Sequence, residues 1–394
     1  MSEVLERAMA VREYAAGIRR YLHRNPEIAF QEHNTTALVK RELSGMGVEI
    51  LDLPLETGAV GVIHGNKPGK GAVTALRADL DALPMTDQSG ADHASANPLA
   101  AHTCGHDGHT AILLGTAKVL RGMTDRFAGT ARLLFQPAEE SLGGALKIIE
   151  AGALANPPAD TAVALHSWPY LPAGSVGVWE GQYMASADSF QVRITGRSGH
   201  GARPHAAVNP IPAAALAISA LQNIVAGEII ASQQAVVTVC VMSGGTAFNI
   251  IPDEVTFGGT VRCLDEGVRR ELKARIERTV TGAARTLGCE AALAYHFGVP
   301  SLVNDPQVAK AVKKAAAEAL GGEHVLSLDG PVMGSEDFAE IINTAGGRGA
   351  LFRLGMGVEG REVTALHNSR FDFNDDAIPA GVAAFTQYVL NANG

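Results

Sequence analysis

The sequence predicts an α/β protein in which a larger domain is interrupted by a smaller, inserted α+β domain. Three observations lead to this prediction. The chain has 394 residues, more than one typical core accommodates, so two domains are expected. Before about residue 183, apolar strand-like segments alternate with polar turns and helix-like segments, as in an α/β sheet. Beyond that point the order becomes strand, helix, strand, strand, helix, strand.

The first half of the chain contains three strand-like segments, each followed by a polar turn. They occupy residues 71–84, 129–140 and 160–170, and helical spacing occurs at 109–123 and 143–154. This alternation is typical of strands joined by crossover helices, so we expect a mixed sheet flanked by helices. Ligands bind outside the carboxyl ends of such strands. Polar residues that directly follow these strands are therefore candidate site residues.

The middle of the chain predicts a ferredoxin-like split unit. Its expected elements are strand 187–196, helix 209–226, strand 233–244, strand 253–265, helix 266–288 and strand 289–298. Helix–strand alternation returns after about residue 294. We therefore expect residues 1–182 and 294–394 to build one domain, and residues 183–293 to form an inserted lid domain.

Composition argues against several classes of function. The net charge of -9 argues against nucleic acid as a partner, because phosphate binding needs a basic stripe. The N-terminal segment lacks the apolar run of a signal peptide, and the longest apolar stretch, AAALAISAL, is too short to cross a bilayer. Cys104, Cys240, Cys263 and Cys289 form no CxxC pair, which suits a reducing compartment. We expect a cytoplasmic protein with no membrane or nucleic acid partner.

Side chains that bind metal ions gather in the segment HTCGHDGHTA and at the predicted strand ends. Cys104 and His106 offer a thiolate and an imidazole two residues apart. Glu139 and Glu140 follow the second strand, and His166 ends the third. Alone, these features have ordinary structural explanations: a helix-capping loop, a solvated turn and a histidine at the edge of the core. Because they fall at neighbouring strand ends, together they predict a shared metal site.

The two adjacent glutamates suggest a division of roles. Neighbouring residues in extended backbone point in opposite directions. We therefore expect one of Glu139 and Glu140 to bind metal while the other faces a water molecule, as metal-assisted hydrolysis requires. His367, in VTALHNSRFDF, lies far along the sequence, and no local spacing rule makes it a ligand.

Seven motifs make the chain similar to a known family. They are HTCGHDGHTA, FQPAEE, ALHSWP, GRSGHGARPHAAVNPI, GTAFNIIPDEV, GSEDFA and ALHNSRFDF. In this order and approximate spacing, the motifs resemble those of hippurate hydrolases and indole-acetyl-amino-acid hydrolases, a branch of the aminoacylase and carboxypeptidase-G metallopeptidase family. The resemblance covers essentially the whole chain. It implies a two-metal, aminopeptidase-like catalytic domain with an inserted lid.

The resemblance also implies a ligand set for two divalent metal ions. Cys104 would bridge the two ions. Glu140 and His367 would complete one site, and His106 and His166 would complete the other. Thiolate favours zinc, whereas mixed nitrogen and carboxylate ligands tolerate manganese, cobalt or nickel. We expect zinc or manganese, with cobalt and nickel as further options.

Other residues near the expected site take their roles from the same resemblance. Glu139 would be the general base that takes a proton from water and delivers it to the leaving amine. The wider family has a histidine ligand where this chain has Arg77, and in this branch His106 takes over as the ligand. Asp79 is expected to orient a histidine. His109 is expected to be structural, because a packed or capping histidine is common.

Four residues of the expected lid also match the family. His200, in SGHGARPH, matches the histidine that polarises the scissile carbonyl, commonly across a dimer, and His205 is a weaker second candidate. Asn249 and Arg262 match positions that hold the amino-acid carboxylate, for which a guanidinium is well shaped. Alternatively, Arg262 is a surface residue of a strand, paired with Asp265.

The leading hypothesis is a metal-dependent amidohydrolase that splits N-acyl amino acids into a carboxylic acid and a free amino acid. A dipeptidase or a deacetylase of N-acetylated diamino acids would use the same site. In a different class, Cys104 would be the nucleophile of an acyl transferase. A catalytically silent binding protein is disfavoured, because every residue type required by the two-metal mechanism is present. The resemblance further implies a homodimer or a higher homo-oligomer, and a small-molecule substrate.

Overall fold

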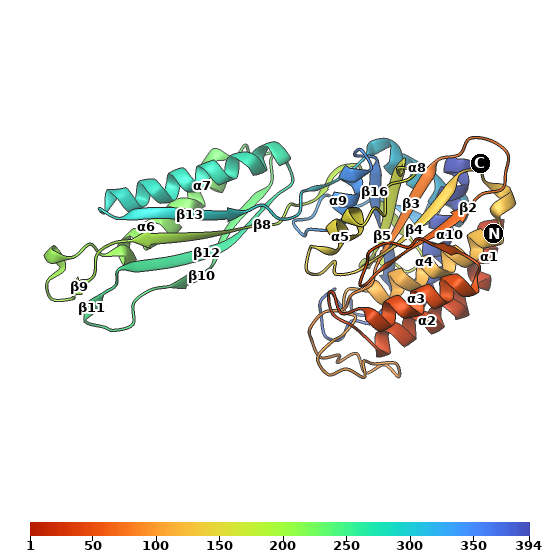
Figure 1. Cartoon of the computed structure of the whole chain (residues 1–394), viewed down its shortest axis with the longest axis horizontal. Helices are drawn as coiled ribbons and strands as arrows, with labels where there is room; N and C mark the ends of the chain where they lie inside the picture. Colours follow the sequence, from red (N-terminus) through yellow and green to blue (C-terminus); the bar gives the residue numbers. More distant parts are fainter. The chain divides into compact units, whose positions relative to one another are not determined.

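The computed structural model describes all 394 residues, and the chain forms two compact units. The main unit comprises Met1–Gly181, Val303–Gly330 and Asp337–Gly394, and the inserted unit comprises Gln182–Leu302 and Pro331–Glu336. Figure 1 shows the elements of both units. Each unit has a hydrophobic core of its own, so each buries its apolar side chains without help from the other.

An eight-stranded sheet forms the centre of the main unit, in the order β1-β2-β4-β3-β5-β16-β6-β15. Its strands are β1 Glu49–Ile50, β2 Ala59–His64, β3 Val73–Asp79, β4 Thr130–Gln136, β5 Thr161–Pro172, β6 Val176–Val178, β15 Val325–Leu326 and β16 Gly349–Gly357. Strands β3, β4, β5 and β16 are parallel, whereas β2 pairs antiparallel with β1 and β4. Strand β6 pairs antiparallel with β16 and parallel with β15. The predicted mixed sheet is therefore confirmed.

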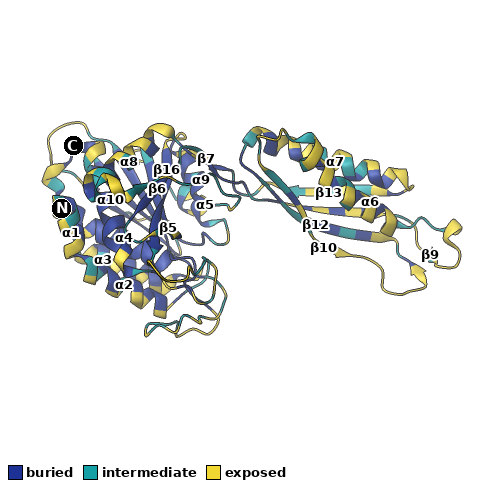
Figure 2. Cartoon of the chain, turned by 180° about the vertical axis from the view of Figure 1, so that it is seen from behind, coloured by how far each residue is buried: buried dark blue, intermediate teal, exposed yellow.

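Helices cover this sheet on both sides. They are α1 Glu3–Ala10, α2 Arg12–Arg24, α3 His33–Gly45, α4 His106–Arg121, α5 Gly144–Glu150, α8 Pro306–Leu320, α9 Phe338–Thr344 and α10 Ile378–Asn393. Because both faces are covered, β3 and β4 are buried along their whole length, and the sheet is drawn largely in dark blue in Figure 2. Successive apolar residues, such as Leu133, Leu134 and Phe135 in β4, satisfy this two-sided burial.

The inserted unit contains an antiparallel sheet of four strands, in the order β10-β12-β8-β13. Its main elements are β8 Asp188–Thr195, α6 Pro210–Asn223, β10 Ala235–Ser243, β12 Glu254–Cys263, α7 Glu266–Thr286 and β13 Glu290–His296. The predicted order of strands and helices is confirmed. Residues of β8 alternate between buried and exposed positions, because only one face of this sheet packs against the helices.

The bounds of the inserted unit differ from the predicted range of 183–293. Residue 293 falls inside β13, and a strand cannot be divided between two cores. In addition, Pro331–Glu336 returns to the inserted unit. Hydrogen bonds tie this segment to the start of the unit: the Val332 N–H donates to the Tyr183 carbonyl, and the Ala185 N–H donates to the Gly334 carbonyl.

Short elements complete the chain. They are strands β7 Gly181–Met184, β9 Gly199–His200, β11 Ile250–Ile251 and β14 Leu302–Asn304. There are also four 3₁₀ helices, η1 Thr124–Arg126, η2 Pro204–Ala206, η4 Gly322–His324 and η5 Asp375–Ala377, and a π-helix, η3 Ile224–Glu228. Helix α6 and η3 together form one stretch, Pro210–Glu228, that is long and apolar enough to span a membrane by length and composition alone. One side of α6 packs into the core of the inserted unit through Ala213, Ala217 and Leu221.

Candidate metal centre

Parallel strands bring polar residues from distant parts of the sequence to one edge of the main sheet. Asp79 is the last residue of β3, and β3 pairs in parallel with both β4 and β5. Glu139 and Glu140 follow β4, and His166 lies in β5. The carboxyl ends of these strands therefore form the crevice in which an α/β sheet places its chemistry.

The segment that carries Cys104 and His106 enters the same crevice at the start of α4. Gly105 precedes this helix with φ = 91°, a conformation that a side chain would strain. A Cβ atom at this position would lie 2.6 Å from Oγ of Ser167. That hydroxyl donates to the carbonyl oxygen of Cys104 at 2.8 Å. The close approach of Gly105 to β5 thus positions Cys104 and His106 against His166.

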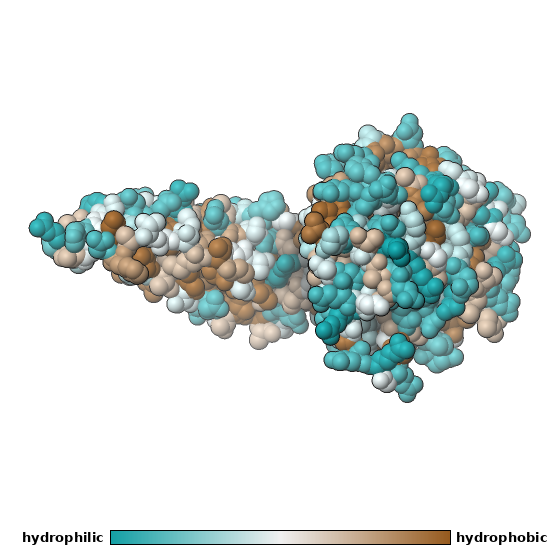
Figure 3. All heavy atoms as spheres, turned by 90° about the horizontal axis from the view of Figure 1, so that it is seen from below, coloured by the Kyte–Doolittle hydropathy of each residue, from teal (hydrophilic) through white to brown (hydrophobic).

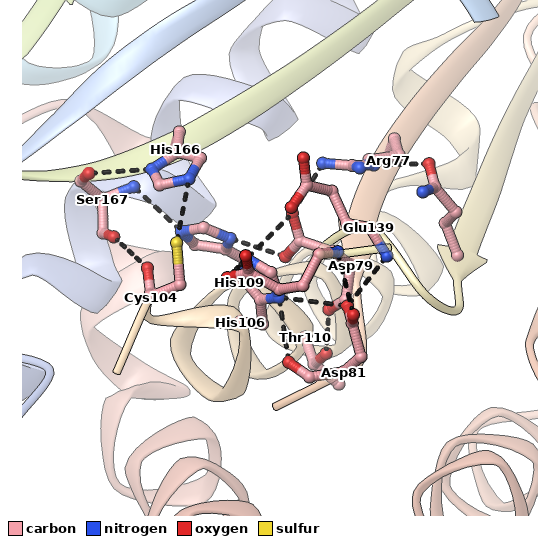
Figure 4. A network of polar contacts seen from close by, with 12 residues as sticks. Arg77, Asp79, Asp81, Cys104, His106, His109, Thr110, Glu139, His166 and Ser167 are labelled. Atoms are coloured by element: carbon pink, nitrogen blue, oxygen red, sulfur yellow. Dashed lines mark hydrogen bonds and ion pairs between the residues drawn. The ribbon is translucent and has the colours of Figure 1, made fainter. Parts of the chain in front are cut away.

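The five predicted ligands converge in two groups of three that share Cys104. One group is Cys104, His106 and His166, and the other is Cys104, Glu140 and His367. Within each group, the candidate ligand atoms all lie within 4.8 Å of one another. Figure 4 shows the first group, in which Sγ of Cys104 lies 3.5 Å from Nε2 of His166. In the second group, Nε2 of His367 lies 3.2 Å from Oε1 of Glu140.

Hydrogen bonds engage Nδ1 of each buried histidine, which leaves Nε2 for a metal ion once any proton on it has been displaced. Nδ1 of His106 is 2.9 Å from the carbonyl oxygen of Asp81, and Nδ1 of His166 is 2.9 Å from the carbonyl oxygen of Ser167. A carbonyl oxygen only accepts, so Nδ1 carries the proton and donates in each ring. The Nε2 atoms are therefore free to act as metal ligands. Nε2 of His106 is buried and makes no hydrogen bond within the protein.

These distances fit metal coordination. In a tetrahedral zinc site, ligand bonds of about 2.3 Å to sulfur and about 2.1 Å to nitrogen or oxygen separate a sulfur from a nitrogen by about 3.6 Å and a nitrogen from an oxygen by about 3.4 Å. The observed separations are 3.5 Å for Cys104 and His166, and 3.2 Å for Glu140 and His367. The donor set of one sulfur, three imidazoles and one carboxylate suits two divalent metal ions that share the sulfur.

The protonation of the metal-free ligands also fits a site for cations. Burial raises the pKa of the Cys104 thiol. The contacts of His367 with Cys104 and Glu140 raise its pKa to about 10. Burial alone would lower the pKa of His106, but the nearby Asp79 and Cys104 outweigh burial and raise it well above its usual value. Without metal, the cluster therefore holds protons, and these must leave when cations bind.

The backbone at Glu139 and Glu140 is a turn, so the predicted extended conformation is wrong. Ala138 has φ = 53° and Leu142 has φ = 56°, both in the left-handed region. Such residues cost about 1–2 kcal/mol each. The turn closes through hydrogen bonds from the Leu142 N–H to the Glu139 carbonyl and from the Gly144 N–H to the Ala138 carbonyl. Carboxylate oxygens of both glutamates still lie within 4.8 Å of Nε2 or Nδ1 of the His106 ring.

Asp79 contacts His109, and both nitrogens of that histidine are engaged. Its Nδ1–H donates to Oδ1 of Asp79 at 2.7 Å, and its Nε2 accepts from the Ser167 N–H at 2.8 Å. His109 is therefore a neutral structural residue with no nitrogen left for a metal. Arg77 donates to Oδ2 of Asp79 at 2.6 Å and to Asp337 at 3.0 Å, so its buried guanidinium is neutralised by two carboxylates.

Sequence reasoning missed Asp81, a buried member of the network in Figure 4. Its carboxylate accepts hydrogen bonds from the backbone N–H groups of Glu139 and Glu140. A signal was present in RADLDALP, where two aspartates follow a strand two residues apart and thus share a side of the backbone.

His102, close in sequence to the ligand Cys104, should make the free energy of unfolding depend on pH. Burial lowers its pKa to about 4, and neither ring nitrogen has a hydrogen bond. In the unfolded chain its pKa is about 6.5, so the unfolded state binds more protons between about pH 6.5 and pH 4. The free energy of unfolding should therefore fall by about 3 kcal/mol as the pH decreases through this window.

The measurement is urea unfolding of metal-free protein across this pH range, for the natural chain and for His102→Leu. The difference between their pH profiles isolates this histidine, since the other titrating groups are common to both. We expect the profile of His102→Leu to be flatter by the amount given above. Parallel profiles would show that His102 does not remain neutral in the folded state.

The predicted residues of the lid lie in two separate places within the inserted unit. His200 in β9 pairs with Ile250 in β11, directly beside Asn249. Arg262 lies near the opposite end of β12, where it donates to Oγ of Ser335 at 2.5 Å. Eight residues of strand separate Arg262 from Glu254, which is about 26 Å. Within one inserted unit, Asn249 and Arg262 therefore cannot hold the same carboxylate.

Two predictions for the lid remain, the role of His205 and the alternative pairing of Arg262. His205 is exposed in η2 and makes no side-chain contact that would fix its role. The alternative pairing of Arg262 with Asp265 is not observed, because Asp265 instead caps α7 by accepting from the Val268 N–H.

Comparison with known proteins identifies relatives along almost the whole chain. Residues 75–391 match Peptidase family M20/M25/M40. The chain is 38% identical over 374 residues to an N-acetylcysteine deacetylase of Bacillus subtilis, covering 95% of both proteins. It is also 38% identical over 387 residues to the IAA-amino acid hydrolase ILR1-like 4 of Arabidopsis thaliana, covering 96% of this chain and 86% of that protein.

Solved structures give the same result. A putative aminohydrolase from methicillin-resistant Staphylococcus aureus matches with a TM-score of 0.93 and 32% identity, covering 99% of both chains. A Bacillus subtilis protein described as a dinuclear metal-binding peptidase of the M20 family matches with a TM-score of 0.85 and 34% identity, covering 97% of this chain and 98% of that one. The two groups of candidate ligands at the sheet edge agree with these matches. The chain therefore belongs to Peptidase family M20/M25/M40 and is a dinuclear metal-dependent hydrolase.

Proposed function

We propose that this enzyme hydrolyses the amide bond of N-acyl amino acids and releases a carboxylic acid and a free amino acid. The observation that carries this proposal is the pair of ligand groups joined by Cys104, with a second carboxylate, Glu139, beside them. This arrangement supplies metal sites and a separate proton acceptor, which amide hydrolysis by a metal-activated water requires.

We propose the following roles for the protein residues, with that of His200 taken from the family resemblance. When bound, two divalent cations lower the pKa of a water molecule and polarise the scissile carbonyl. Glu139, almost completely buried, accepts a proton from the attacking water and later delivers it to the leaving amine. Nδ1 of His200 accepts from the Ala202 N–H, so its Nε2 carries a proton and can donate to the carbonyl oxygen of the substrate.

Relatives of this chain bear the names of enzymes that act on different substrates. The relatives named above are a deacetylase of N-acetylcysteine and a hydrolase of IAA-amino acids, which differ in the acyl group removed. A relative from Saccharolobus solfataricus, 36% identical over 379 residues, is named thermostable carboxypeptidase 2. We therefore propose N-acyl amino acids as the main substrate class, and keep dipeptides and N-acetylated diamino acids as the second candidate.

The alternative mechanism makes Cys104 a nucleophile that forms an acyl-enzyme. A reactive cysteine needs a lowered pKa, and burial instead raises the pKa of this thiol. Its sulfur also lies among four other candidate ligands rather than beside a single base. The geometry therefore favours the role of a metal ligand.

Removal of metal tests this choice directly. Incubation of the purified enzyme with a chelator should abolish hydrolysis of hippurate, acetylated amino acids and indole-acetyl conjugates, and added Zn²⁺ or Mn²⁺ should restore it. We propose zinc or manganese as the native pair, with cobalt and nickel as further options, and metal analysis of the purified protein identifies them. Turnover that survives complete removal of metal would contradict the two-metal mechanism and favour the nucleophilic cysteine.

We also propose that the enzyme is a homodimer formed through the inserted unit. Strand β10 is an edge of its sheet, and Val241 and Met242 on it are 63% and 47% exposed. Phe248, beyond the same strand, is fully exposed. Exposed edges and apolar patches of this kind bind other chains. Figure 3 shows apolar surface, in brown and tan, on this unit.

A dimer also resolves the separation of the lid residues. Asn249 and Arg262 are too far apart in one inserted unit to hold one carboxylate, so two protomers would have to supply them. We expect the natural chain to be a dimer in size-exclusion chromatography with light scattering, and Val241→Lys to be largely monomeric. Leu99→Lys, at a 76% exposed position of the main unit, is the control and should remain dimeric. A monomeric natural chain would exclude this assembly.

We further propose a cytoplasmic location. All four cysteines are free, and three of them are buried, which suits a reducing compartment. Substrate and products are small molecules, and the negative net charge does not favour nucleic acid.

A further inference from the structure

Asp81 links the turn that carries Glu139 and Glu140 to the metal ligand His106 through hydrogen bonds. Its side chain is 1% exposed, and it lies just beyond the end of β3. Oδ1 accepts from the Glu139 N–H at 3.0 Å, and Oδ2 accepts from the Glu140 N–H at 3.0 Å. One carboxylate thus holds two successive backbone N–H groups.

The same residue also holds the ring of His106. Nδ1 of this histidine lies 2.9 Å from the carbonyl oxygen of Asp81 and 3.2 Å from its Oδ1. A hydrogen bond of this kind fixes the tautomer and the orientation of a ligating imidazole and increases its basicity. Glu139, Glu140 and His106 form a further group whose candidate ligand atoms lie within 4.8 Å of one another. Asp81 is therefore bonded to every member of that group.

The turn needs such a partner because of its backbone conformation. Ala138, directly before the two glutamates, is held at φ = 53°. This conformation directs the following N–H groups toward a common point, where an anion is favoured. Glu32 accepts from the Ala138 N–H at 2.8 Å but does not contact His106. Glu32 and Asp81 thus support the same turn, and only Asp81 also reaches a metal ligand.

We propose that Asp81 is a positioning residue that sets the distance between the general base Glu139 and the metal ligands His106 and Glu140. This inference rests on the proposed function. It assigns Asp81 no contact with substrate: the carboxylate acts through the two backbone amides and the imidazole. Loss of one of its oxygens as an acceptor should therefore disturb catalysis and metal binding together.

The test is Asp81→Asn, which keeps the shape of the side chain but replaces one accepting oxygen with a donor. We expect kcat to fall by about 10–100-fold with KM changed far less, and affinity for Zn²⁺, measured by competition with a chromophoric chelator, to weaken by about 10–100-fold. Glu32→Gln is the matched control. It retains the oxygen that accepts from Ala138, so kcat and Zn²⁺ affinity should stay close to those of the natural chain.

The outcomes separate this inference from the proposed function. The inference requires both kcat and Zn²⁺ affinity of Asp81→Asn to fall. If either value equals that of the natural chain, the inference is overturned, and a change in melting temperature alone would make Asp81 a structural residue. If the natural chain hydrolyses no N-acyl amino acid, the proposed function fails, yet the Zn²⁺ affinities still test Asp81. Should Asp81→Asn not fold, Asp81→Glu, which displaces the carboxylate by one methylene, is measured in the same way with the same criteria.

Discussion

Replacement of Glu139 by glutamine is expected to lower kcat by about 10²–10⁴-fold, the usual contribution of a general base. Glutamine has nearly the same shape but cannot accept the proton of the attacking water. Both metal ions should stay bound, because Glu139 belongs to neither of the two groups that share Cys104. The measurement is steady-state kinetics on an N-acyl amino acid, together with metal analysis of the same preparation.

The control for this substitution is Glu150→Gln, at an exposed position in α5, which should leave kcat unchanged. Glu139 also lies within ligand distance of His106 and Glu140, so a direct role in metal binding is the competing explanation. Loss of a metal ion in Glu139→Gln would favour that explanation. A kcat equal to that of the natural chain would remove Glu139 from the mechanism.

The location of the site was predictable because it depends on strand order and on local sequence. β3 and β4 are short apolar segments that lead into polar residues, and parallel pairing brings their ends beside β5. His166 does not end β5 as predicted, because this strand continues to Pro172. The thiol and imidazole of HTCGHDGHTA are close in sequence and remain close in the structure. For these parts of the site, nearness in sequence and the direction of the strands were sufficient information.

His367 could not be placed from its surroundings in the sequence. It has φ = 60°, and its N–H donates to the Thr103 carbonyl at 2.8 Å. This hydrogen bond brings a segment after β16 against the segment that carries Cys104. A contact between residues so far apart in the chain produces no pattern in the local sequence. Only the family resemblance therefore indicated His367 as a ligand.

The prediction of extended backbone at Glu139 was wrong for a different reason. Left-handed backbone is usually signalled by glycine or asparagine, and here the residue in that conformation is Ala138. Three buried carboxylates, from Glu32, Asp81 and Asp337, accept N–H groups of the turn and the start of α5. The conformation is thus imposed by tertiary contacts, which a local sequence pattern does not reveal.

Cys104→Ala is expected to weaken metal binding at both sites, because its sulfur is the only ligand atom common to the two groups. Each site would keep two protein ligands: His106 and His166 in one, Glu140 and His367 in the other. Loss of a direct ligand should exceed the effect of losing an outer hydrogen bond, so we expect Zn²⁺ affinity to fall by more than about 100-fold. Metal content after dialysis and chelator competition measure this change.

Cys263→Ala is the control, since this thiol is also buried but belongs to the core of the inserted unit and to none of the candidate ligand groups. It should retain both metal ions and full turnover. The two mechanisms predict different results for Cys104→Ala, although both predict an inactive enzyme. A bridging ligand takes metal with it when it is removed, whereas a nucleophile leaves the metal content unchanged. Two metal ions per chain in inactive, folded Cys104→Ala would therefore refute the shared-sulfur centre and return Cys104 to the role of nucleophile.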